Sequence, residues 1–124
     1  MGKCTINGVE LEFDIFDGET YKKFTEARNE FVEELGKIDN ESSDFFIRQC
    51  RVIKDFFDRG FGEGTGEKVC GERDNLRSCI NAMGEAIKEE ERQAAEIKEG
   101  NEYYAKIVAR STKPNRQQRR ANKK

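Results

Sequence analysis

The stretch FFDRGFGEGTGEKVCG, residues 56–71, separates two amphipathic helical patterns and holds five of the chain's eleven glycines. A Walker phosphate loop needs Gly-Lys-Ser/Thr, but Gly66 is followed by Glu67, and the dinucleotide pattern GxGxxG would require a glycine at that same position 67. Glu63 and Glu67 would also repel a phosphate held on backbone amides. We therefore predict an inter-helix turn with a short helical segment that ends at Gly71.

Helical periodicity extends on the N-terminal side of this stretch. A helix is predicted over residues 43–59, where Gly60 would stop it, and another over residues 19–37, where Asp17 would cap it. The apolar stripe of the earlier helix is formed by Tyr21, Phe24, Phe31, Leu35 and Ile38. The stripe of the later helix is formed by Phe46, Cys50, Ile53 and Phe57, widened by Phe45, Val52 and Phe56.

On the C-terminal side, Asp74 is expected to cap a third long helix whose apolar stripe runs from Leu76 to Ile97. Gly100-Asn101 is expected to bend or interrupt it. A last apolar patch follows at Tyr103, Tyr104, Ile107 and Val108. This patch has two readings, as ordinary core folded back on the hairpin or as a surface that docks a partner.

The N-terminus alternates with period two, and Asn7-Gly8 is the dipeptide that best supports a two-residue type I′ hairpin turn. Such a turn predicts the register of the two strands. The pairs would be Ile6 with Val9 and Cys4 with Leu11 on the apolar face, and Thr5 with Glu10 and Lys3 with Glu12 on the wet face. A lone hairpin is marginal in water, so a helix must cover its apolar face.

Composition fits one small domain with a thin core, because 35% of its residues are hydrophobic and 39% are charged. The predicted fold class is mainly α (α+β): an N-terminal β-hairpin packed on a three- to four-helix array, with nine phenylalanines supplying much of the burial. Residues 1–109 would form this domain, and residues 110–124 a flexible basic tail, disordered alone. Association with copies of itself or with a partner would add burial that the core lacks.

The chain has no histidine, and its cysteines at 4, 50, 70 and 79 form no CxxC pair. This pattern argues against a zinc site and against a base-activated nucleophile, so we expect no metal, no cofactor, no catalytic residues and no enzymatic activity. Without a signal peptide or an apolar span, we expect a cytoplasmic protein with reduced thiols and no membrane association.

Charge is unevenly distributed along the chain. Residues 110–124 carry +7 and no acid, whereas the other 109 residues carry −9. The tail could contact nucleic-acid phosphates, dock on an acidic protein surface, or serve as a soluble end. It has no interleaved aromatic side chains of the kind that stack on bases. Its basic residues are Arg110, Lys113, Arg116, Arg119, Arg120, Lys123 and Lys124.

Three segments together resemble the small tail assembly chaperones of long-tailed bacteriophages and prophages. They are the opening TINGVELEF (residues 5–13), the central FFD…FGEGT…VCG…NL (residues 56–76), and the basic end NRQQRRA (residues 115–121). The central segment is the most distinctive of the three.

The resemblance implies a non-enzymatic protein that binds the tape measure protein, or another tail protein, during tail morphogenesis in the cytoplasm of a bacterial host. A homo-oligomer fits this interpretation as well. The alternatives are a small nucleic-acid-binding accessory protein that acts through the basic tail, and a structural tail component. Helix-in-groove recognition uses apolar side chains at helical spacing. The expected partner-binding residues are the exposed members of the set Phe45, Phe56, Phe61, Tyr103, Tyr104 and Ile107.

Overall fold

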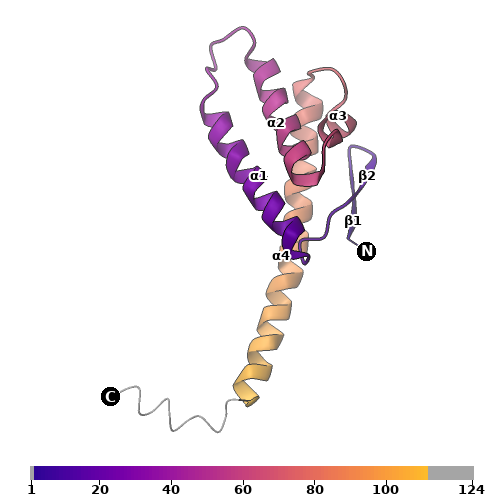
Figure 1. The fold of residues 1–124 in the computed structure, drawn as a ribbon, viewed down its shortest axis with the longest axis vertical. Helices are drawn as coiled ribbons and strands as arrows, with labels where there is room; N and C mark the ends of the chain where they lie inside the picture. Colours follow the sequence, from indigo (N-terminus) through magenta and orange to yellow (C-terminus); the bar gives the residue numbers. More distant parts are fainter. Residues whose placement is uncertain (1, 112–124) are drawn as a thin grey trace, which may run out of the picture. The chain divides into compact units, whose positions relative to one another are not determined.

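The computed structural model describes residues 2–111, which form a two-stranded antiparallel hairpin followed by four helices (Figure 1). This confirms the predicted fold class. The elements are β1 (Lys3–Ile6), β2 (Val9–Glu12), α1 (Gly18–Gly36), α2 (Phe45–Phe61), α3 (Thr65–Cys70) and α4 (Leu76–Ser111). The chain divides into two compact units, Met1–Gln93 and Ala94–Lys124, and the division falls within α4.

The hairpin has the predicted register, in which Ile6 pairs with Val9 and Cys4 with Leu11. Asn7 and Gly8 have φ values of 50° and 80°, which a type I′ turn requires at both central positions. Cys4 and Ile6 are buried. On the opposite face of the hairpin, Lys3, Thr5, Glu10 and Glu12 are exposed to solvent. Period-two alternation and turn chemistry therefore agree in this hairpin.

Asn7 fastens the hairpin turn to the helices of the first unit. Its Nδ2 donates to the carbonyl oxygens of Val69 at 2.7 Å and Ser78 at 3.0 Å, and its Oδ1 accepts from Asn81 Nδ2 at 2.7 Å. Its backbone N–H donates to Glu85 Oε1 at 2.7 Å. One residue therefore connects β1 to α3 and to the first turns of α4.

The core of the first unit is a cluster of phenylalanine rings, as the composition indicated. The largest fully buried side chains include Phe13, Phe24, Phe56 and Phe57. Phe24 lies 5.0 Å from Phe13 and 5.5 Å from Phe56, measured between ring centroids, and α1 and α2 pack side by side around these contacts (Figure 1). Tilted and edge-on aromatic pairs of this kind contribute about 0.5–1.5 kcal/mol each beyond their buried area.

The predicted stop of the second helix at Gly60 is wrong. α2 continues to Phe61, and Gly62 caps it with a φ of 124° that favours glycine. Gly60 is instead buried inside α2, where a Cβ would lie 3.4 Å from the Cβ of Ala27 on α1. The glycine therefore permits the close approach of α1 and α2 rather than ending a helix.

The third long helix begins one residue later than predicted, and Asn75 rather than Asp74 caps it. Asn75 Oδ1 accepts the backbone N–H of Ser78 at 3.1 Å. Asp74 instead pairs through Oδ1 with Lys54 Nζ on α2 at 3.2 Å, and the same ammonium donates to the carbonyl oxygens of Glu72 and Arg73. The ion pair occupies the carboxylate that would otherwise have capped the helix.

Gln93 joins α4 to the segment that connects β2 with α1. Its side chain is 3% exposed; its Nε2 donates to the carbonyl of Phe13 at 2.8 Å, and its Oε1 accepts the N–H of Ile15 at 2.9 Å. A glutamine amide can satisfy a carbonyl and an N–H of the same extended segment together. These two bonds satisfy backbone groups of a segment whose Phe13 and Ile15 side chains are buried.

The second unit contains the remaining residues of α4, where the predicted interruption at Gly100-Asn101 does not occur. The helix is continuous from Leu76 to Ser111. A single glycine in a helix costs about 1 kcal/mol relative to alanine, which the hydrogen bonds of a long helix can outweigh.

Candidate functional site: an apolar groove on three helices

An apolar groove of about 480 Å³ opens on the first unit between α1, α2 and α4. Aliphatic, aromatic and thioether side chains dominate its walls. The lining residues are Phe31 and Leu35 from α1, Gln49 and Ile53 from α2, and Ile80, Met83, Gly84, Ile87 and Lys88 from α4. We call this set the α1–α2–α4 groove.

Helical spacing brings these side chains to one place. Phe31 and Leu35 are four residues apart on α1, and Ile80, Met83 and Ile87 follow three- and four-residue steps on α4. Ile53 is 3% exposed and Ile80 is 55% exposed, so the groove spans buried and solvent-facing side chains. The apolar stripes predicted for these helices therefore divide into a buried part and an open wall of the groove.

Gly84 contributes to the hollow because it leaves part of the α4 wall without a side chain. A Cβ added there would have no neighbouring atom within 4 Å, even though Met83 and Ile87 on the same helix line the groove. Extended apolar concavities are where amphipathic helices dock. The groove can thus bury apolar side chains of a helical ligand, while Gln49 and Lys88 offer polar contacts.

The predicted partner-binding residues do not gather at this groove. Phe56 is 1% exposed and packs against Phe24 and Phe57, so it is a core ring rather than an exposed one. Phe61 is half-buried and lies 4.8 Å from Phe13 between ring centroids, in the same aromatic cluster. Phe45 is half-buried near the start of α2, against the exposed ring of Phe46.

The other three predicted contact residues belong to the second unit. Tyr103 and Tyr104 are each 66% exposed and Ile107 is 40% exposed, which does not support the alternative that they are core. Arg110 is also exposed on α4. The other basic positions named above, Lys113, Arg116, Arg119, Arg120, Lys123 and Lys124, lie outside the described residues.

The glycine-rich stretch packs closely against α2, and the amide of Gly66 is not available to bind a phosphate. A Cβ on Gly66 would lie 2.4 Å from the carbonyl oxygen of Lys54, so α3 approaches α2 too closely for any side chain at this position. The N–H of Gly66 donates to Asp58 Oδ1 at 2.8 Å. A carboxylate therefore occupies the place that an anionic ligand would need.

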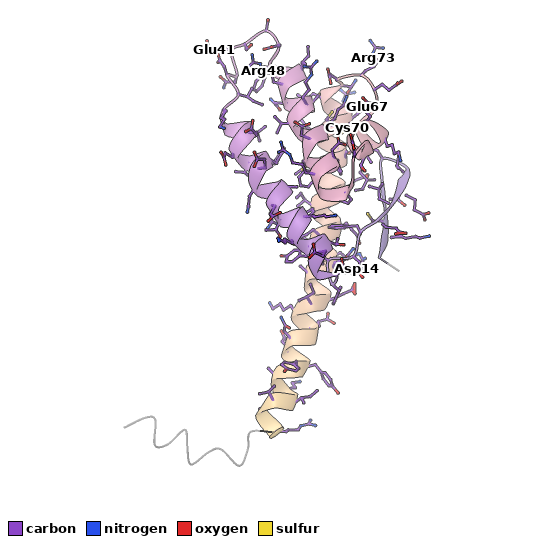
Figure 2. The ribbon with its side chains drawn as sticks, viewed as in Figure 1. Asp14, Glu41, Arg48, Glu67, Cys70 and Arg73 are labelled. Carbon is purple, nitrogen blue, oxygen red and sulfur yellow. The ribbon has the colours of Figure 1, made fainter. Side chains whose placement is uncertain are left out.

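The four cysteines are free and buried, and three of them meet where α2, α3 and α4 come together. Cys50 and Cys70 both lie close enough to Cys79 to influence the pKa of its thiol; Figure 2 labels Cys70 on α3. Burial raises the thiol pKa of Cys50 to about 12, and of Cys4 and Cys79 to about 11 each. Neutral thiols are poor nucleophiles and poor metal ligands.

Within residues 2–111, no group of three or more histidine, cysteine, aspartate or glutamate side chains is arranged to hold a metal ion. Over the same range, none of the helices is long and apolar enough to cross a membrane.

Sequence reasoning missed the groove although it found the stripes that line it. Ile53 and the α4 stripe were predicted as apolar helix faces, and no pattern in the sequence says how far the three helices close over them. The available signal was Gly84, a residue without a side chain in the middle of an apolar helical face.

The chain belongs to the family DUF6673, a family of unknown function, whose model matches residues 7–123. No curated protein and no solved structure matches the chain.

Proposed function

We propose that this member of the DUF6673 family is a non-enzymatic binding protein that holds the apolar face of a partner helix in its α1–α2–α4 groove. The partner would be the tape measure protein or another tail protein of a bacteriophage, and the role that of a tail assembly chaperone. The observation that carries the proposal is the groove itself, an apolar concavity built by three helices. The resemblance of residues 5–13 and 56–76 to phage tail assembly chaperones supports the choice of partner.

The chemistry of the groove favours a helix over a small polar substrate. A surface lined by Phe31, Leu35 and Met83 gains free energy by burying apolar side chains, at about 25 cal/mol per Å² of apolar surface removed from water. A long helical protein that awaits assembly exposes such side chains, and their transient coverage would keep it soluble.

The test is an affinity pull-down of the tagged full-length protein from cells expressing the surrounding phage or prophage genes, with bound proteins identified and nucleic acid quantified. Washing at about 300 mM salt weakens phosphate contacts steeply but leaves hydrophobic docking intact. Ile80→Glu places a charge on an exposed groove wall, and Gly84→Leu fills the groove without adding charge. Val32→Glu is the matched control, because Val32 is 63% exposed on α1 and lies outside the groove.

We expect a long helical tail protein to be recovered by the wild type and by Val32→Glu, and to be lost with both groove variants. Equal recovery by Ile80→Glu and Gly84→Leu would overturn the assignment of the groove. Recovery of nucleic acid alone, abolished by removal of residues 110–124, would favour the nucleic-acid alternative. Retention of the chain in mature particles would identify a structural tail component.

A further inference from the structure

The part of α4 from residue 97 to residue 108, which we call the distal segment, is itself an amphipathic helix. Tyr103 and Ile107 are four residues apart, and Ile97 lies two turns before Tyr104, so these side chains share one broad face. Lys106 falls on the opposite side of the helix. The exposed tyrosines and Ile107 therefore present the kind of surface that an apolar groove accepts.

The dimensions of the two surfaces agree. At a rise of about 1.5 Å per residue, the α4 wall from Ile80 to Ile87 extends about 10 Å and the distal segment about 16 Å. Two turns of the distal segment, carrying Tyr104 and Ile107, are enough to run along the groove.

Net charge differs between the first unit and the C-terminal part of the chain. Residues 1–93 contain 14 basic and 22 acidic residues, a net −8, whereas residues 94–124 contain nine basic and three acidic residues, a net +6. The distal segment itself is neutral, with Lys98 and Lys106 against Glu99 and Glu102, so the positive excess comes from the basic residues that follow it. Opposite net charges attract these basic residues to the acidic first unit of another copy during encounter, and they favour this pairing over contacts between like units.

One wall of the groove and the distal segment belong to the same uninterrupted helix, Leu76–Ser111. Occupation of the groove by the distal segment of the same chain would require α4 to break between Lys88 and Ile97. Occupation by the distal segment of another copy requires no change in either helix.

We propose that the α1–α2–α4 groove of one chain holds the distal segment of a second copy of the chain, and that a partner helix displaces this segment. Each chain then contributes one groove and one distal segment, so the contact is reciprocal in a closed pair or repeats along an open series. The displacement step rests on the proposed function, whereas the contact between copies stands without it.

The contact between copies is tested by sedimentation of the full-length protein over a range of concentrations, with circular dichroism to verify folding. We expect a concentration-dependent mass above that of one chain, which decreases as salt screens the opposite charges. Ile80→Glu alters the groove, and the double variant Tyr104→Ser with Ile107→Ser alters the distal segment; each should weaken association at least about tenfold, a change of about 1.4 kcal/mol. Val32→Glu should associate like the wild type.

Mixing the two defective variants is the sharper test. The Ile80→Glu chain keeps an intact distal segment and the double variant keeps an intact groove, so an equimolar mixture should form a complex that neither variant forms alone. Failure of the mixture to associate, with both variants folded, would overturn the proposal. So would a wild-type chain that stays a monomer at every concentration, or a Val32→Glu chain that is equally impaired.

Pull-downs with the same variants separate this inference from the proposed function. Loss of self-association in the double variant together with undiminished recovery of the tail protein supports both ideas. Recovery of the tail protein that depends on Ile80, from a chain that never self-associates, would remove the inference alone. Self-association through the groove without any recovered tail protein would remove the proposed function alone.

Discussion

Asn7 occupies a tight turn, yet its side chain makes three hydrogen bonds to residues more than sixty positions away. Asparagine suits both tasks, because it tolerates positive φ and its amide both donates and accepts. The turn itself was predictable from Asn7-Gly8. Its contacts with Val69 and Ser78 were not, because a local pattern does not identify distant carbonyl groups.

Asn7→Asp is expected to lower the free energy of unfolding by about 2–3 kcal/mol, because it places a carboxylate against two carbonyl oxygens while keeping a turn-compatible side chain. The carboxylate faces acceptors, so its pKa should rise in the folded state. The loss should shrink as pH falls through that raised pKa and reach its minimum below about 4, where the carboxyl is protonated in both states. Denaturant unfolding of wild type and variant at neutral and acidic pH measures this difference. A pH-independent loss would contradict the hydrogen-bond explanation.

Gly66→Ala tests whether the glycine-rich stretch is structural. The added Cβ would lie 2.4 Å from Lys54 O and 2.7 Å from Lys54 Cα, atoms of the α2 backbone that cannot turn aside. We expect a loss of about 1–3 kcal/mol or more in thermal or denaturant unfolding. Gly100→Ala is the matched control, because that glycine is helical and has no atom within 4 Å of its added Cβ. Equal effects of both substitutions would remove the close-approach argument.

At the scale of elements, the sequence predicted what local chemistry controls. The register of the hairpin follows from its alternation, and Asp17 caps α1 as expected, since its Oδ2 accepts the N–H of Thr20 at 3.0 Å. The errors occurred where tertiary contacts decide. Asp74 forms an ion pair with Lys54 and does not cap α4. Gly60 is buried against α1 and does not end α2.

We expect the buried thiols of α2 and α4, Cys50 and Cys79, to make the protein less stable at alkaline pH. The ordinary thiol pKa is 9.0, and burial raises it to about 11 for Cys79 and about 12 for Cys50. Below 9.0 the thiols are neutral in both states. Above it the unfolded chain releases protons that the folded chain retains, so the free energy of unfolding falls as pH rises through the folded-state pKa.

This loss can be followed through the ultraviolet absorbance of thiolates, titrated under reducing conditions with and without denaturant. The folded protein should ionise its thiols at a higher pH than the denatured protein. Coincident titration curves would show that burial does not protect these cysteines.

At the scale of the whole molecule, the buried core of the described residues is confined to the first unit, whereas exposed apolar side chains occur in both units. Every buried side chain of residues 2–110 lies at or before Gln93, including the ring cluster around Phe24 and Phe56. The three stripes that line the groove were visible in the sequence. Their incomplete closure depends on how far apart the helices settle, which no single stripe encodes.

Removal of the residues after Ile97 should therefore leave the thermal midpoint of the first unit within a few degrees of that of the whole chain. The comparison belongs at low protein concentration, because association of the whole chain would raise its midpoint by mass action. Calorimetry of both chains measures the effect. A large drop in the midpoint at low concentration would mean that the second unit contributes to the core after all.

The attachment of Asn7 also determines where the protein can accept a foreign insertion. Hairpin tips are ordinarily convenient places for an epitope or a fluorescent reporter. Here such an insertion would pull the turn away from Val69, Ser78 and Asn81. The loop between α1 and α2, where Figure 2 labels Glu41, is the better choice. Asn40 and Glu41 are exposed there, and the N–H of Glu41 donates to Asp39 Oδ1, only two residues away. A reporter placed at Asn40 would leave the hairpin attached to α3 and α4.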